Sequence, residues 1–172
     1  MRHSLTKPDA EKLVHAFITS RIDYCNSLLA GIPAKTTQRL QYVQNCAARI
    51  LTKTRKSEHI TPILHSLQWL PVTNWINYKV LIMVFNAINH TGPTYLQELL
   101  TRQHSHNSRT LRSASSNLLA FPQTKLVTMG DRAFSSLGPR LWNQLPENIR
   151  TSASLSVFRK CLETHLFHTA FY

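Results

Sequence analysis

Basic side chains gather on one face of the helix predicted over residues 36–56. At about 100° per residue, the apolar side chains of this stretch fall within one arc about 100° wide. This apolar stripe consists of Leu40, Val43, Ala47, Ile50 and Leu51. The opposite face carries Lys35, Arg39, Tyr42, Arg49, Lys53 and Lys56. No Asp or Glu occurs from Tyr24 to Ser57, so this face is suited to contact phosphate groups.

The same residues also fit the solvated face of an ordinary helix, and this second interpretation stays open. Stacking on nucleic-acid bases needs an exposed aromatic side chain beside the cations, and we expect Tyr42 to supply it. Trp69, Trp75 and Trp142 lie among apolar residues in the sequence and are predicted to be structural. The pattern therefore predicts phosphate contact without sequence preference.

Catalytic chemistry has little support in the sequence. Phosphoryl or nucleotidyl transfer by two metal ions needs clustered carboxylates, whereas Asp9, Asp23 and Asp131 are far apart along the chain. No glycine-rich phosphate loop and no GxSxG motif occurs. We therefore expect no catalytic residue and no cofactor.

Metal binding is considered at one helix face, where Cys161, His165 and His168 follow the spacing i, i+4, i+7. These side chains are of the types that bind zinc, but their face is also the apolar one, which favours core packing. His104 and His106 lie in a polar tract without a nearby cysteine. We therefore expect no metal site. Cys25 and Cys46 have no evident histidine partner and are not predicted to be nucleophiles.

The charge balance points to a polyanionic partner. The 172 residues include 20 Lys and Arg but only 8 Asp and Glu, a net charge of +12. Nucleic acid is the first candidate for such a chain, ahead of a membrane surface. The most apolar stretch, residues 80–88, is far shorter than the ~20 residues of a spanning helix. We therefore predict RNA or DNA as partner, bound through phosphates, and no membrane.

The helical period and the turn signals predict a mainly α fold. A first helix over 6–29 and the basic helix over 36–56 should form an antiparallel hairpin. Shorter helices are expected over 62–67 and 93–100, with a longer one over 73–89 between them. The predicted domains are a helical lobe over 1–100, a basic polar linker over 101–117 and a small α-rich lobe over 118–172. That last lobe includes a candidate β-hairpin from 118–121 and 125–128, a short helix from Pro139 and a final helix to about His168.

Seven blocks of the chain resemble, in order, one region of a known family. They are DAEKLVHAFITSRIDYCNSLL, LQYVQNCAARILT, HITPILHSLQWLPV, GPTYLQELL, RTLRS, GDRAFSSLGPRLWNQLP and SLSVFRKCLETHLF. Together, from about Asp9 to Phe171, they are similar to the thumb and post-polymerase extension of LINE-type (non-LTR) retrotransposon reverse transcriptases. The resemblance implies a helical thumb that grips a template–primer duplex and an extension that assists RNA or DNA binding.

The chain also departs from that family. The family's catalytic aspartates lie in the fingers and palm, which these blocks do not include, and neither its endonuclease domain nor the zinc knuckle that some family extensions carry has a counterpart here. No catalytic residue is therefore carried over. The leading hypothesis is a noncatalytic reverse-transcriptase remnant that binds RNA or DNA through the basic helix. The alternatives are a structural or protein-interaction module, with the missing palm or another protein as partner, and the tail of a longer active polymerase.

Overall fold

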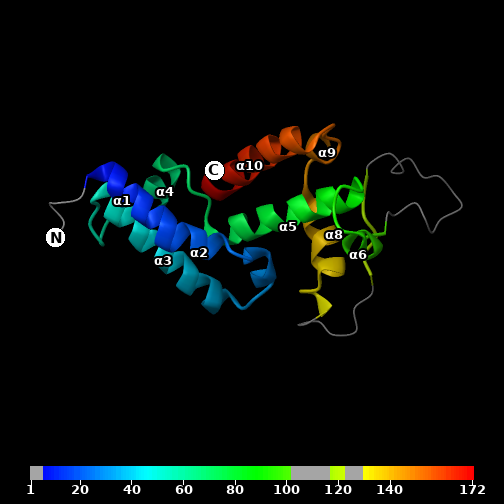
Figure 1. The fold of residues 1–172 in the computed structure, drawn as a ribbon, viewed down its shortest axis with the longest axis horizontal. Helices are drawn as coiled ribbons and strands as arrows, with labels where there is room; N and C mark the ends of the chain where they lie inside the picture. Colours follow the sequence, from blue (N-terminus) through cyan, green and yellow to red (C-terminus); the bar gives the residue numbers. More distant parts are fainter. Residues whose placement is uncertain (1–5, 102–116, 123–129) are drawn as a thin grey trace, which may run out of the picture. The chain divides into compact units, whose positions relative to one another are not determined.

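The structure is a computed structural model that describes residues 6–101, 117–122 and 130–172. This part of the chain is mainly helical, which confirms the predicted fold class (Figure 1). The chain forms two compact units. Unit 1 comprises Met1–Ile76 and Leu166–Tyr172, and unit 2 comprises Asn77–His165.

Unit 1 begins with an uninterrupted helical run of α1 (Lys7–Val14), the π-helix η1 (His15–Thr19) and α2 (Ser20–Asp23). Thr6 is the N-cap residue of α1, and its hydroxyl donates to the Asp9 carboxylate. The prediction of one helix over 6–29 is wrong at its C-terminal end. Tyr24 is extended and Cys25 has a φ of 51°, so the chain turns and continues as the 3₁₀-helix η2 (Asn26–Leu29).

The second long helix, α3 (Ala34–Thr52), lies side by side with α1 and η1, as the predicted hairpin requires (Figure 1). Val14 of α1 packs with Ala47 and Leu51 of α3, and the small Ala47 side chain is fully buried. The predicted apolar stripe is only partly correct, because Val43 and Ile50 are 43% and 54% exposed. Fully buried Ala48 instead belongs to the packing face, since α4 covers that side of α3.

The short helix α4 (Thr61–Ser66) places Ile63 and Leu64 on Ala48 of α3. Polar contacts fix the corner that follows α4. The backbone N–H of Val72 donates to the Gln41 side chain at 2.8 Å, and the Gln44 side chain donates to the Leu70 carbonyl at 2.9 Å. Two residues of α3 therefore determine where α5 (Val72–Ile88) begins.

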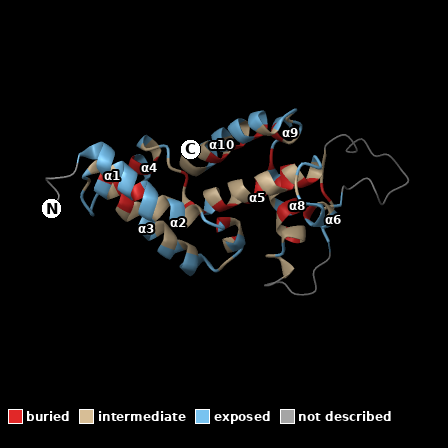
Figure 2. Ribbon diagram, viewed as in Figure 1, coloured by how far each residue is buried: buried red, intermediate tan, exposed pale blue. Residues whose placement is uncertain are grey.

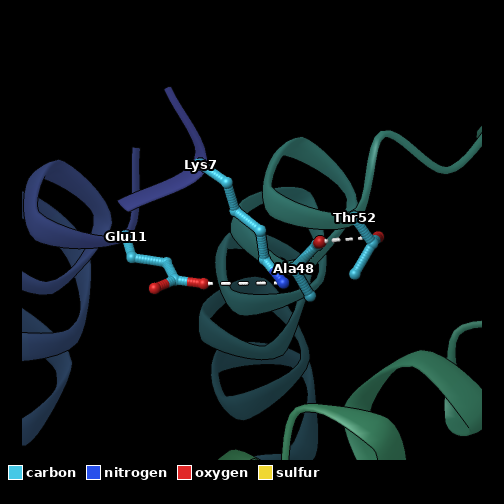
Figure 3. Close-up of polar contacts among 4 residues, drawn as sticks. All are labelled: Lys7, Glu11, Ala48 and Thr52. Atoms are coloured by element: carbon cyan, nitrogen blue, oxygen red, sulfur yellow. Dashed lines mark hydrogen bonds and ion pairs between the residues drawn. The ribbon is translucent and has the colours of Figure 1, made fainter. Parts of the chain in front are cut away.

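Further polar contacts stabilise the ends of the unit 1 helices. Figure 3 shows Lys7 paired with Glu11 along α1 at 3.8 Å, and the Thr52 hydroxyl donating to the Ala48 carbonyl at 2.9 Å. The indole N–H of Trp75 donates to the Asp23 carboxylate at 2.7 Å. That last contact fixes the end of α2, which the local sequence pattern did not predict.

Unit 2 contains the rest of α5 together with α6 (Thr94–Glu98), α8 (Phe134–Gln144), α9 (Glu147–Arg150) and most of α10 (Leu155–Phe171). Its core holds a group of aromatic rings. Phe85 stacks on Phe158 with ring centroids 4.3 Å apart, and Trp142 lies 5.7 Å from Phe158. All three side chains are buried.

Helix α8 passes through Pro139 without interruption, which corrects the prediction that a new short helix starts there. A proline restricts the preceding residue chiefly through that residue's Cβ and N–H, and Gly138 has no Cβ. The same glycine allows close packing on α5, because an added Cβ would lie only 3.0 Å from Cγ2 of Val84. Helix α8 is therefore continuous at Gly138, which packs closely on α5, although Gly138 and Pro139 predict a break in the helix.

The structure does not support the first strand of the predicted β-hairpin. Residues 118–121 form no strand, and the part of the chain that the structure describes contains no sheet. The Asn143 side chain instead accepts the backbone N–H of Leu119 at 3.0 Å and donates to its carbonyl at 2.9 Å. The second predicted run, 125–128, lies outside the described residues, as does almost all of the linker over 101–117. The division into lobes 1–100 and 118–172 stays a prediction.

Candidate nucleic-acid interface

Helix α3 positions most of the predicted basic face, but it ends earlier than expected. It begins after Pro33 and ends at Thr52, where Lys53 adopts a left-handed conformation with a φ of 55°. The backbone N–H groups of Lys53 and Thr54 both donate to the Arg49 carbonyl. Lys53 and Lys56 therefore lie in a turn after the helix, which corrects the prediction of a helix over 36–56.

Four of the predicted cations are accessible and unpaired. Lys35, Arg39, Lys53 and Lys56 are exposed, and Figure 2 shows exposed stretches along both α1 and α3. None of the four has a side-chain ion pair or hydrogen bond within residues 6–101, 117–122 and 130–172. On the neighbouring α1, by contrast, Lys7 pairs with Glu11 and Lys12 with Asp9, each at 3.8 Å. Within the described part of α1, α3 and the turn after α3, the cations that lack side-chain partners are therefore on α3 and in that turn.

Arg49 does not offer its guanidinium to solvent in the way the sequence predicted. Its Nη1 donates to the Arg55 carbonyl at 2.6 Å, and its Nη2 donates to the Glu58 carbonyl at 2.8 Å. The side chain spans the turn that follows α3 and is half-buried. Helix periodicity places Arg49 on the basic face correctly but gives no information on these two backbone acceptors.

Tyr42 is 60% exposed on the same side of α3 as Lys35 and Arg39. A hydrogen bond and a charge interaction with the nearby Cys46 thiol raise the pKa of Tyr42 above its usual value of 10.0. The phenol is therefore neutral near pH 7 and presents an uncharged ring. An exposed ring beside unpaired cations has the chemistry needed for base stacking.

One exposed cation and one aromatic pair were not among the predicted site residues. Arg55 is exposed within the same turn as Lys53 and Lys56, and the run KTRK was the signal that could have found it. At the C-terminus, the rings of His168 and Tyr172 are stacked with centroids 5.2 Å apart, and Tyr172 is exposed. The Tyr172 hydroxyl also lies 3.1 Å from Nε2 of His65.

The remaining residues of chemical interest have structural contacts. Asp9 pairs with Lys12, Asp23 accepts the Trp75 indole, and Asp131 lies 3.3 Å from Arg140. No three His, Cys, Asp or Glu side chains of the described ranges are grouped as metal ligands, Cys161, His165 and His168 included. His104 and His106 lie outside those ranges.

Two further predictions can be compared with the structure. The interpretation of the tryptophans as structural is confirmed, since Trp142 is buried, Trp69 packs on both unit 1 clusters and Trp75 bonds Asp23. Where the chain is described, no helix has both the length and the apolar character to cross a bilayer.

Comparison with known proteins adds no assignment. The chain matches no protein-family model, and it has no significant match to a curated protein or to a solved structure. The resemblance to reverse transcriptases therefore stays a prediction. The geometry shows a helix and turn that together present one exposed tyrosine and five exposed cations whose side chains have no partner among the described residues.

Proposed function

We propose that this protein is a noncatalytic remnant of a retrotransposon reverse transcriptase that binds RNA or DNA through phosphate contacts. One observation carries the binding part of the proposal. Lys35, Arg39, Lys53, Arg55 and Lys56 are exposed on α3 and its following turn, and none of their side chains forms an ion pair with a described acidic residue. A surface of this kind attracts a polyanion without reading its sequence.

The noncatalytic part is supported by the roles of the three aspartates. Each has a local structural partner: Lys12 for Asp9, the Trp75 indole for Asp23 and Arg140 for Asp131. Polymerisation by two metal ions needs carboxylates that converge on a common site. A primer–template incubated with this chain, Mg²⁺ and nucleotides should stay unextended, and extension by the purified chain would disprove this part.

The binding part is tested by fluorescence anisotropy with a labelled single-stranded oligonucleotide over a salt series. The logarithm of the association constant should fall linearly with the logarithm of the salt concentration, with a slope of about −0.7 for each phosphate contacted. The double variant Lys35→Gln/Arg39→Gln should bind more weakly and reduce that slope by about one.

The matched control is Lys7→Gln/Lys12→Gln, which removes the same formal charge from α1. Because Lys7 and Lys12 are already paired with Glu11 and Asp9, this control should lose less affinity than the α3 variant. Equal losses would show that only net charge matters and would contradict the assignment to α3. Binding that does not weaken as salt rises would contradict phosphate contact itself.

A protein-interaction role is the second candidate, and exposed apolar side chains of unit 1 favour it. Phe17 is 72% exposed, and Leu13, Leu28, Val43 and Ile50 are exposed as well. Exposed apolar residues of this size can drive association when they form one patch. Sedimentation with and without an oligonucleotide separates the candidates, because self-association that nucleic acid leaves unchanged favours the protein-interaction role.

A further inference from the structure

The turn after α3 is built by a network of polar contacts centred on Arg49. The two terminal guanidinium nitrogens of Arg49 bond the carbonyls of Arg55 and Glu58 at 2.6 and 2.8 Å. The Arg49 carbonyl in turn accepts the N–H of Thr54 at 3.1 Å, and Lys53 occupies the left-handed position that ends the helix. The same residue therefore bonds both the beginning and the end of the turn.

The turn also has contacts of its own that restrict its shape. The Glu58 carboxylate accepts the backbone N–H of Arg55 at 3.0 Å, and the Glu58 N–H donates to the Arg55 carbonyl at 3.2 Å. The hydroxyl groups of Thr52 and Thr54 are hydrogen-bonded to each other. The backbone of residues 52–58 is thus held at several points, although every side chain from Arg55 to Glu58 is exposed.

The three cations of this turn lie within four consecutive residues. A chain of three residues spans at most about 10 Å, so the Cα atoms of Lys53 and Lys56 are no further apart than that. Phosphates on one strand of duplex DNA advance about 3.4 Å along the axis per nucleotide. Lys53, Arg55 and Lys56 can therefore face two or three consecutive phosphates of one strand.

We propose that residues 53–56 form a phosphate-binding turn for a nucleic-acid strand, and that Arg49 is its positioning residue rather than a phosphate ligand. This inference rests on the proposed function and adds to it the part of the surface that holds the strand. A guanidinium can bond two carbonyls at once because its donors form a planar fork, whereas a lysine ammonium is a single point charge on a flexible stem. Arg49→Lys therefore keeps the charge but loses the bridge.

The first experiment measures binding of a single-stranded oligonucleotide by the full chain over a salt series. The variant Lys53→Gln/Arg55→Gln/Lys56→Gln should bind on the order of tenfold more weakly at about 0.1 M salt, with a slope reduced by about two. Arg49→Lys should also lose affinity and slope, although its net charge is unchanged. Combining Arg49→Lys with the triple variant should cause little further loss, because Arg49 acts through the same cations.

Two results would overturn the inference. Arg49→Lys could keep the affinity and slope of the wild type, or its loss could add in full to that of the triple variant, which would make Arg49 an independent ligand. Amide hydrogen exchange provides the structural readout. Arg49→Lys should speed exchange at residues 53–58 and leave Ala47 and Leu51 protected, whereas loss of protection throughout α3 would indicate unfolding.

The variant Glu58→Gln tests phosphate binding while keeping a hydrogen bond that shapes the turn. Glutamine retains a side-chain oxygen that can accept the Arg55 N–H, but it removes the one acidic charge of the turn. We expect this variant to bind the oligonucleotide severalfold more tightly, and unchanged or weaker binding would contradict a phosphate site here. If Lys35→Gln/Arg39→Gln weakens binding and the turn variants do not, only this inference fails. If the wild type does not bind, the proposed function fails.

Discussion

Units 1 and 2 build their cores from different side chains. Unit 1 relies mainly on aliphatic side chains in two clusters, one around Ala47 and Leu51 and the other around Ala48, Ile63 and Leu64, and Trp69 packs against both. Unit 2 stacks Phe85 on Phe158 and places Trp142 beside them. Small side chains let helices approach closely but bury little apolar area per residue, whereas each aromatic ring buries a large area.

The two units also differ in what they leave accessible. In unit 1, η1 and α3 expose large apolar side chains such as Phe17 and Ile50, and α3 also carries exposed cations. Hydrogen bonds made by the side chains of Gln41, Gln44 and Trp75 add to the apolar packing of unit 1. Unit 2 also exposes apolar side chains, among them Tyr95 and Phe121, so the difference is the acid-free run of unit 1 that carries the exposed cations of α3 and its following turn.

If aromatic packing dominates unit 2, truncating the stacked ring of Phe158 should lower the free energy of unfolding more than the other substitutions. Phe158→Ala should lower the free energy of unfolding by about 3–5 kcal/mol, because it leaves a cavity against Phe85 and Trp142. Urea unfolding followed by circular dichroism measures the change. The matched control is Phe17→Ala, the same substitution at a ring that is 72% exposed, which should cost no more than about 0.5 kcal/mol. A costly Phe17→Ala would mean that unit 1 is covered in solution.

A smaller loss is expected from the main aliphatic contact of unit 1. Leu51→Ala should lower the free energy of unfolding by about 2–3 kcal/mol, because it removes a buried side chain from the cluster that holds Val14, Ala47 and the partly buried Trp69. The adjacent Ile50→Ala is the control and should cost less than about 1 kcal/mol, since Ile50 is 54% exposed. A loss from Leu51→Ala as large as that from Phe158→Ala would remove the difference between the two cores.

The smallest expected effect is a change in the pKa values of two tyrosines, which are raised for different reasons. For Tyr42 in unit 1 the main cause is the Cys46 thiol, whereas for Tyr78 in unit 2 it is burial, with Glu163 adding to it and Arg159 opposing it. Cys46→Ala should therefore return the pKa of Tyr42 toward 10.0, whereas Glu163→Gln should lower that of Tyr78 only in part. NMR titration of ring-labelled tyrosine resolves the two groups.

The same titration predicts a pH dependence. A raised phenol pKa stabilises the folded state while the phenol is protonated, so the contribution of Tyr78 is fully present below pH 10.0 and is lost as the pH rises through its folded pKa. The free energy of unfolding should therefore decline above about pH 10. A Tyr78→Phe variant should show a smaller decline, and an unchanged decline would assign it to other groups.

The sequence by itself determined the helical class and much of the basic face. The periodicity of apolar residues predicted α3, α5 and α10 to within a few residues at most ends, and it placed Lys35, Arg39 and Tyr42 on an exposed side. These features depend on side chains three or four positions apart, which lie on one face of a single helix. The run without acidic residues from Tyr24 to Ser57 likewise follows from the sequence alone.

Only the tertiary structure decided which side chains of that helix are available. Ala48 is buried and Ile50 is not because α4, more than ten residues further on, covers one side of α3. Arg49 bonds two carbonyls of a turn whose path no periodicity encodes, and α8 continues through Pro139 because Gly138 packs on Val84. In each case the deciding contact comes from an element or turn outside the local pattern, and its position is fixed by the folded chain.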